Sequence, residues 1–224
     1  MITVHHLEHS RSQRVLWLLE ELGVDYEIHL YERDPETRLA PPELKQVHPL
    51  GKSPVIADGD RTLAESGTII EYLARRYGSG KWAPALDHDA YWDFHYWMHY
   101  AEASLMPPFL LRLVFDMVST RSPMLIKPIA RGISAQVGKA FINPQIKTHL
   151  DFVEAHLSDR DWFVGDRISG ADVQMSFPLE AALSRGLVGE QRPNIAAFVR
   201  RCHDRPAYHR ALEAGGPYDY GPSN

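Results

Sequence analysis

Hydroxyl side chains occur where a strand pattern ends and a helix pattern begins. Residues 2–7 mix β-branched and apolar types, and Ser10 and Ser12 follow in a short polar loop before a helix-like segment. The first N–H groups of a helix have no partner within the helix and carry a partial positive charge, so they favour an anion. A hydroxyl at this place either caps the helix or donates a hydrogen bond to a bound anion. Both interpretations stay open for Ser10 and Ser12.

Two further segments suit the two ends of a zwitterion. Pro54 opens a strand and cannot donate to the sheet, which leaves the backbone groups of Ser53 free at an edge. Glu65 offers a carboxylate to an ammonium group, and Ser66 begins a helix with a hydroxyl and free N–H groups that suit a carboxylate. Each feature alone is an ordinary cap or strand start, but their joint order predicts a zwitterionic peptide ligand.

The elements that must position these residues fall in the first 80 residues. Alternating and β-branched patterns predict strands, apolar residues at helical spacing predict helices, and Asp58-Gly59-Asp60 predicts a hairpin turn. The predicted order is strand, helix, strand, a polar connection, two strands and a helix, at residues 2–7, 13–22, 26–31, 52–57, 61–64 and 66–77. This βαβ-ββα order favours a four-stranded mixed sheet with helices on its faces.

The rest of the chain has a helical pattern. Gly, Pro and Ala in residues 79–87 indicate a linker, and a long helix is expected from about Asp87, with a stripe that includes Trp92 and Tyr96 packed in the core. Ser169 and Asp172 have the spacing of a capping box and predict a structural role. We expect a first domain at 1–80, an all-helical domain at 87–214 and a flexible tail at 215–224.

Composition and charge narrow the class of protein. The 224 residues are 44% hydrophobic and 24% charged, with a net charge of −5 and no basic block, which argues against a nucleic-acid partner. The single cysteine excludes a disulfide framework and indicates a reducing compartment. No apolar run reaches membrane-spanning length and no secretory signal opens the chain, so we expect a cytoplasmic protein without a membrane partner. His95 and His99 are spaced for a metal, with Glu102 close to the same stripe, but the H-E-x-x-H motif is absent and we expect no metal site.

Four segments in this order resemble the cytosolic glutathione transferases. They read SRSQRVLWLLEELG at 10–23, HPLGKSPV at 48–55, LAES at 63–66 and WFVGDRISGAD at 162–172. The resemblance covers nearly the whole chain. It implies an α/β plus all-α fold, in which a thioredoxin-like domain that binds glutathione precedes an all-helical domain, most often in a homodimer.

The resemblance implies that glutathione, as a co-substrate, is bound as a thiolate and added to a small hydrophobic electrophile. It leaves open whether organic hydroperoxides are also reduced. Other glutathione-dependent reactions occur on this scaffold, including dehalogenation, isomerisation and thiol reduction. A different class of protein, a binding or regulatory module that keeps the fold without catalysis, is the further alternative, because fold alone does not fix function.

The resemblance also carries roles to individual binding residues. The bond before Pro54 is expected to be cis, with Ser53 binding the cysteinyl backbone of glutathione. Glu65 and Ser66 are expected to hold the γ-glutamyl group, and Lys52 matches a basic position that reaches the glycine carboxylate in some subgroups.

The loop after the first strand departs from the family pattern. It contains no tyrosine or cysteine; His9 occupies the slot of the serine subgroups, with Ser10 and Ser12 following. We predict Ser10 as the hydroxyl that donates to the thiolate, Ser12 as the second candidate and His9 as a modulator. The resemblance leaves the subgroup open between a serine type and a related one.

The resemblance places part of the electrophile pocket on the long helix of the second domain. Tyr100, Met106 and Phe109 are the residues expected nearest the pocket.

Overall fold

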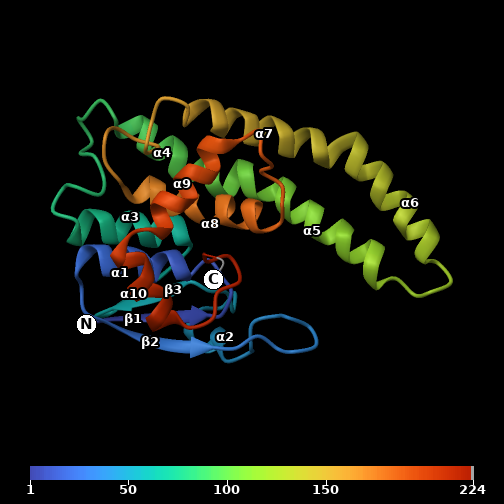
Figure 1. The fold of residues 1–224 in the computed structure, drawn as a ribbon. Coiled ribbons are helices and arrows are strands. Elements are labelled where there is room, and N and C mark those ends of the chain that lie inside the picture. The colour runs from blue at the N-terminus through green and yellow to red at the C-terminus, as the bar shows by residue number, and fades with distance from the viewer. Residues whose placement is uncertain (223–224) are drawn as a thin grey trace.

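The N-terminal part of the chain forms a four-stranded mixed sheet with helices packed on it. The computed structural model describes residues 1–222, shown in Figure 1. Strand β1 pairs with β2 in parallel and with β3 antiparallel, and the order across the sheet is β2-β1-β3-β4. The elements are β1 (Ile2–Leu7), α1 (Gln13–Leu22), β2 (Tyr26–Tyr31), α2 (Leu44–Val47), β3 (Val55–Asp58), β4 (Arg61–Ala64) and α3 (Ser66–Tyr77). The predicted topology is confirmed.

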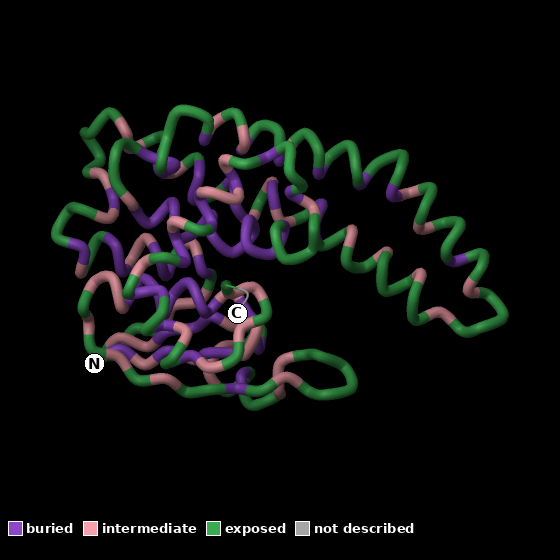
Figure 2. The backbone as a smooth tube through the Cα atoms, in the orientation of Figure 1, coloured by how far each residue is buried: buried purple, intermediate pink, exposed green. Residues whose placement is uncertain are grey.

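The remaining elements are helical. Two long helical arms form a hairpin, and the far end of this hairpin projects from the body and is largely exposed (Figures 1 and 2). The elements are α4 (Tyr91–Tyr100), η1 (Ala101–Leu105), α5 (Met106–Arg121), α6 (Lys127–Val137), η2 (Gly138–Ile142), α7 (Asn143–His156), α8 (Gly170–Ser184), α9 (Pro193–His203) and α10 (Pro206–Gly215). Within residues 1–222, none of the helices has both the length and the apolar character needed to cross a membrane. The predicted fold class is confirmed.

The first arm of the hairpin contains a widened turn just before two prolines. Pro107 and Pro108 have no N–H to donate to the preceding turn. The chain stays helical but widens to the π turn η1, so α4 and α5 form one continuous arm. Glu102 lies in this turn. The proline pair is therefore preceded by a widened turn and does not end the helix.

The core face of α4 differs from the predicted one. Trp92 is 75% exposed and Tyr96 is 49% exposed, so the stripe expected in the core faces outward. The buried side chains are those of Phe94, Trp97 and Met98. Because α4 is aromatic around most of its circumference, the sequence pattern does not distinguish its two faces.

Helix α8 is buried along most of its length and begins at the predicted capping box. The Ser169 hydroxyl accepts a hydrogen bond from the N–H of Ala171, and the Asp172 carboxylate accepts from the N–H of Ser169 at 2.7 Å. Asp172 also accepts from the N–H of Phe163 at 2.7 Å. Burial raises the pKa of Asp172 to about 6, although these hydrogen bonds favour its charged form. The structural role expected for this pair is observed.

The last helix returns to the first domain. α10 packs on α1, and the carbonyl of Gly215 at its end accepts a hydrogen bond from His6 on β1 at 3.1 Å. A Cβ at residue 215 would lie 2.6 Å from an oxygen of Gln13 and 2.8 Å from Leu16, so a larger residue would require both side chains to shift. The sequence gives no sign that the final helix belongs to the first domain in space.

Candidate active site

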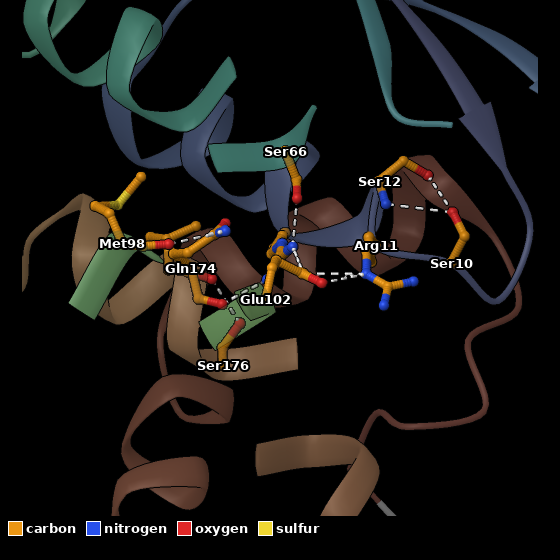
Figure 3. Close-up of polar contacts among 10 residues, drawn as sticks. Ser10, Arg11, Ser12, Ser66, Met98, Glu102, Gln174 and Ser176 are labelled. Carbon is orange, nitrogen blue, oxygen red and sulfur yellow. Dashed lines mark hydrogen bonds and ion pairs between the residues drawn. The ribbon is translucent and has the colours of Figure 1, made fainter. Parts of the chain in front are cut away.

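Ser10 and Ser12 lie together at the start of α1 but have different surroundings. Ser10 Oγ and Ser12 Oγ are 2.8 Å apart, and Ser10 Oγ accepts from the N–H of Ser12 at 3.2 Å (Figure 3). Ser12 is fully buried; its hydroxyl also lies 2.7 Å from His6 Nδ1 and 3.2 Å from the carbonyl oxygen of Leu7. Both serines are buried, but Ser10 caps the turn and lies at the outer end of this pair, since Ser12 alone of the two also contacts β1 among the described residues.

Ser53 lies at the beginning of β3, across from the end of β1. Its hydroxyl donates to the carbonyl oxygen of His5 at 2.8 Å and accepts from the N–H of Leu7 at 3.2 Å. The Ser53–Pro54 bond is cis, as the resemblance implied. Lys52 precedes it and is exposed. The side chain of Ser53 is thus used to join two strands, which leaves its backbone for a ligand.

Glu65 and Ser66 begin α3. Glu65 adopts φ 69°, a left-handed backbone conformation that is uncommon for a residue other than glycine. Such strain is often found at binding sites because the surrounding structure must hold it. Ser66 is buried at the first turn of α3, and its hydroxyl accepts from Arg14 at 2.5 Å. The structure therefore places a carboxylate and a helix N-terminus side by side.

Two arginines and a glutamate link this region to the helical domain. The buried guanidinium of Arg14 contacts Ser66, the backbone oxygen of Gln174 at 2.5 Å and the Glu102 carboxylate. Arg11 donates to both oxygens of Glu102 at 3.0 Å (Figure 3). These three charged residues were not predicted. One feature of the sequence could have predicted the burial of Arg14: it lies on the apolar stripe of α1, four residues before Leu18.

The cluster of Arg11, Arg14 and Glu102 leaves a positive charge near the start of α1. Burial by itself raises the pKa of Glu102, but the two guanidinium groups outweigh it and hold that pKa below its ordinary value. Glu102 is therefore ionised at neutral pH. Two cations against one anion give a net charge of +1, which together with the helix N-termini favours an anionic ligand.

The C-terminal tail packs against the same loop. The N–H of Asp219 lies 3.1 Å from His9 Nδ1, and the Tyr218 hydroxyl donates to the buried Glu180 at 2.7 Å. The Tyr220 ring packs edge-on against Phe177 on α8. The tail was predicted to be flexible; up to residue 222 the structure places it in specific contacts, and residues 223–224 of the predicted tail lie outside the described residues.

The predicted pocket residues belong to one hydrophobic cluster of the structure. Tyr100 is buried and its hydroxyl lies 2.6 Å from His149 Nδ1 on α7, while Phe109 is 1% exposed within the helical core. Met106 is half-buried. Phe177 was not predicted, yet its ring lies 5.0 Å below the guanidinium of Arg11. Of these aromatic residues, Phe177 is the one whose contact with Arg11 brings it to the loop of Ser10.

Comparison with known proteins identifies the family. Residues 10–76 match the family model for the glutathione S-transferase N-terminal domain, and residues 139–206 match the model for the C-terminal domain. The chain is 37% identical to glutathione S-transferase 3 of Schizosaccharomyces pombe over 95% of its length and 87% of that protein. The chain belongs to the glutathione S-transferase family. Glutathione S-transferase 1 of Saccharomyces cerevisiae is 36% identical over 95% of this chain and 94% of that protein.

The solved structures agree with this assignment. A glutathione S-transferase from Actinobacillus pleuropneumoniae is 36% identical, covers 95% of this chain and 92% of its own, and superposes with a TM-score of 0.77. The predicted family and its activity, glutathione conjugation, are thus confirmed at the level of the glutathione S-transferase family, whose members use glutathione as co-substrate.

Proposed function

We propose that this glutathione S-transferase binds glutathione across the first turns of α1 and α3 and the start of β3. Glu65 receives the ammonium group and Ser66 with the N-terminus of α3 receives the γ-glutamyl carboxylate. The backbone of Ser53 pairs with the cysteinyl residue, and Lys52 reaches toward the glycine carboxylate. The strained backbone of Glu65 beside the buried Ser66 supports this arrangement, since it holds a negative carboxylate and the partially positive N-terminus of α3 at one place.

The thiolate is stabilised by Ser10. Ser12 is unsuitable because its hydroxyl is fully buried and already contacts His6 and Leu7. Ser10 lies at the outer end of the pair and donates to sulfur by turning its proton away from Ser12. Lowering a thiol pKa from about 8.5 by two units needs about 2.7 kcal/mol, which matches one charge-assisted hydrogen bond of about 1.5–3 kcal/mol. The difference in hydrogen-bond partners between the two serines is the observation that carries this assignment.

Replacing Ser10 by alanine is expected to raise the pKa of the bound thiol by about two units and to lower kcat/KM about 25-fold at pH 7, because the thiolate fraction falls from about three quarters to about 3%. The ultraviolet absorbance of the thiolate, titrated across pH, measures the first effect, and conjugation of an aromatic electrophile measures the second. Ser184→Ala is the matched control, because Ser184 Oγ contacts only a backbone oxygen of its own helix among the described residues.

Three results would contradict this function or part of it. An unchanged thiol pKa in Ser10→Ala would remove Ser10 from the chemistry and return attention to His9 and the helix N–H groups. Binding of glutathione by the unmodified protein without a thiolate band would support the non-catalytic module. Absence of binding would exclude the proposed site.

The electrophile lies on the side of Arg11 and Phe177, beneath the C-terminal tail. The rings of Phe177 and Tyr220 pack at 5.5 Å, and those of Tyr218 and Tyr220 at 5.4 Å, which forms an aromatic wall beside the loop of Ser10. Such a wall with one guanidinium suits a small hydrophobic electrophile on which negative charge develops. We place the enzyme in the cytoplasm, which the single, buried cysteine supports.

A second copy of the chain covers the projecting hairpin in a homodimer. The apolar residues of α5 recur at helical spacing and remain exposed, and those of α6 do the same. They are Leu110, Leu113, Val114, Met117 and Val118 on α5, Ile126 just before α6, and Ile129 and Ile133 on α6. An exposed apolar surface of this kind supports the homodimer that the family resemblance implied.

Replacing Ile129 and Ile133 together by aspartate is expected to yield a 25.5 kDa monomer in sedimentation velocity, where the unmodified protein sediments as a dimer. The introduced carboxylates of the two copies would be buried opposite each other across the two-fold axis, and like charges disfavour association. Leu30→Asp, at a half-exposed residue of β2 outside the hairpin, should leave the dimer intact. A dimer in the double variant would locate the interface elsewhere.

A further inference from the structure

Ser10 ends a chain of buried polar groups that reaches the last helix. Ser10 Oγ lies 2.8 Å from Ser12 Oγ, Ser12 Oγ lies 2.7 Å from His6 Nδ1, and His6 Nε2 lies 3.1 Å from the carbonyl oxygen of Gly215. His6 and Ser12 are almost completely buried. The chain therefore runs from the proposed sulfur site through α1 and β1 to the end of α10.

The carbonyl of Gly215 fixes the direction of every hydrogen bond in this chain. A carbonyl oxygen only accepts, so His6 Nε2 must carry a proton. Burial lowers the pKa of His6 to about 4, so the ring is neutral at physiological pH and Nδ1 is an acceptor. The single proton of Ser12 then goes to Nδ1 at 2.7 Å and not to the more distant carbonyl oxygen of Leu7 at 3.2 Å, because two lone pairs would otherwise face each other between Ser12 and Nδ1. Ser12 therefore has no proton for Ser10, and the bond between the two hydroxyls uses the proton of Ser10. Without Nδ1, the nearest oxygen to which Ser12 could donate is Ser10 Oγ at 2.8 Å.

We propose that His6 is a positioning residue for Ser10: acting through Ser12, it directs the Ser10 proton away from the glutathione sulfur and limits how readily Ser10 donates to the thiolate. This inference rests on the proposed role of Ser10. In the resting enzyme Ser10 presents a lone pair toward the site and accepts the S–H of an arriving thiol. When that proton leaves for solvent, the Ser10 O–H turns from Ser12 to the thiolate, so one hydrogen bond is broken as another forms.

A restraint of this kind has a chemical use. The nucleophilicity of a thiolate falls as its pKa falls, and the best attacking thiol has a pKa near the ambient pH. Because the Ser12 hydroxyl is polarised by His6, it holds the Ser10 proton more firmly than an isolated hydroxyl would. The chain thus keeps the bound thiol from becoming too acidic to react.

Two substitutions of His6 separate its two ring nitrogens. The side-chain amide of asparagine reaches the place of Nδ1 and can still accept from Ser12, whereas that of glutamine reaches the place of Nε2 and keeps only the contact with Gly215. We expect His6→Gln to lower the pKa of the bound thiol by about half a unit to one unit, a threefold to tenfold gain in the thiolate ratio, as one neutral hydrogen bond is removed. His6→Asn should retain the pKa of the unmodified enzyme.

The direction of the shift distinguishes positioning from a merely structural role. Loosening of the loop would weaken thiolate stabilisation and raise the thiol pKa in His6→Gln, and that result would overturn the proposal. Ser12→Ala should lower the pKa in the same way, and the double variant should match Ser12→Ala alone, because both changes release the same proton. If the shifts in thiol pKa added in the double variant, His6 and Ser12 would act independently and not through one series of hydrogen bonds.

A measurement without glutathione tests the chain independently of the proposed function. Nitrogen-15 NMR of the unliganded protein should show His6 protonated at Nε2 and unprotonated at Nδ1 at neutral pH. The opposite tautomer would reverse the direction of the hydrogen bonds from Ser10 through Ser12 to His6 and would exclude the proposal. If the expected tautomer is found but Ser10→Ala leaves the thiol pKa unchanged, the proposed role of Ser10 fails while the hydrogen-bond direction stands.

Discussion

Replacing Arg14 by methionine is expected to lower the free energy of unfolding by about 3–5 kcal/mol. The side chain of Arg14 is 1% exposed, and its guanidinium contacts Glu102, Ser66 and the backbone oxygen of Gln174. Methionine fills a similar volume but leaves these acceptors without their donor. The cost is large because a partly buried carboxylate loses its closest cation. Urea denaturation at neutral pH measures the change in free energy.

Arg11 supplies the matched control for this prediction. It donates to the same carboxylate, but its side chain is 37% exposed. Water can therefore solvate the Glu102 carboxylate at this place when Arg11 is removed. Arg11→Met should therefore lower the free energy of unfolding by about 1 kcal/mol or less. Equal effects of the two substitutions would show that burial does not govern the energetics of this cluster. Arg14→Lys, which keeps the charge but loses the planar fork, should fall between them.

Acid is expected to destabilise the protein through His6. The pKa of His6 is about 4 in the folded chain and 6.5 in its ordinary state, and burial is the main cause. Below pH 6.5 the unfolded chain takes up a proton that the folded chain does not, so the free energy of unfolding falls as the pH falls. The loss ends near pH 4, where the folded chain also binds the proton. A difference of this size corresponds to about 3 kcal/mol across the window.

Comparison of the unmodified protein with His6→Asn isolates this contribution. Asp172 acts in the opposite direction, because its pKa is raised to about 6 and its protonation stabilises the folded chain as the pH falls. Both proteins keep Asp172, so its effect cancels in the difference. Urea denaturation at pH 7 and pH 4.5 should show a smaller acid loss in His6→Asn. Equal losses would mean that His6 is not buried as a neutral ring.

The sequence predicted the sheet better than the helical arms, and the reason lies in the patterns. Strand β1 and the hairpin around Gly59 carry local signals, because alternation and turn residues act within a few positions. The outward face of α4 was misassigned because this helix has aromatic residues on most of its faces. In the sequence, an exposed ring such as that of Trp92 cannot be distinguished from a core residue. No local rule indicates that Pro107 and Pro108 widen a turn instead of ending a helix.

The candidate site shows the same division between local and distant information. Ser53, Glu65 and Ser66 belong to short motifs with fixed spacing, so their segments could be chosen before the structure was seen. Glu102 could not, because its carboxylate meets Arg14 only when two helices 88 residues apart in sequence pack together. The sequence already favoured Ser10 over Ser12, but the contacts of Ser12 with His6 and Leu7, which support that proposal, depend on how the loop packs against β1.

The return of α10 to the first domain has a consequence for how the protein is made. Helix α1 and His6 leave the ribosome long before their partners, α10 and the carbonyl of Gly215, because Gly215 follows His6 by 209 residues. Until α10 is made, the apolar face of α1 that α10 covers stays open and His6 lacks its acceptor. The packing of the first domain is therefore completed only after α10 has been synthesised, so a nascent chain stalled before residue 206 should be a substrate for chaperones and proteases.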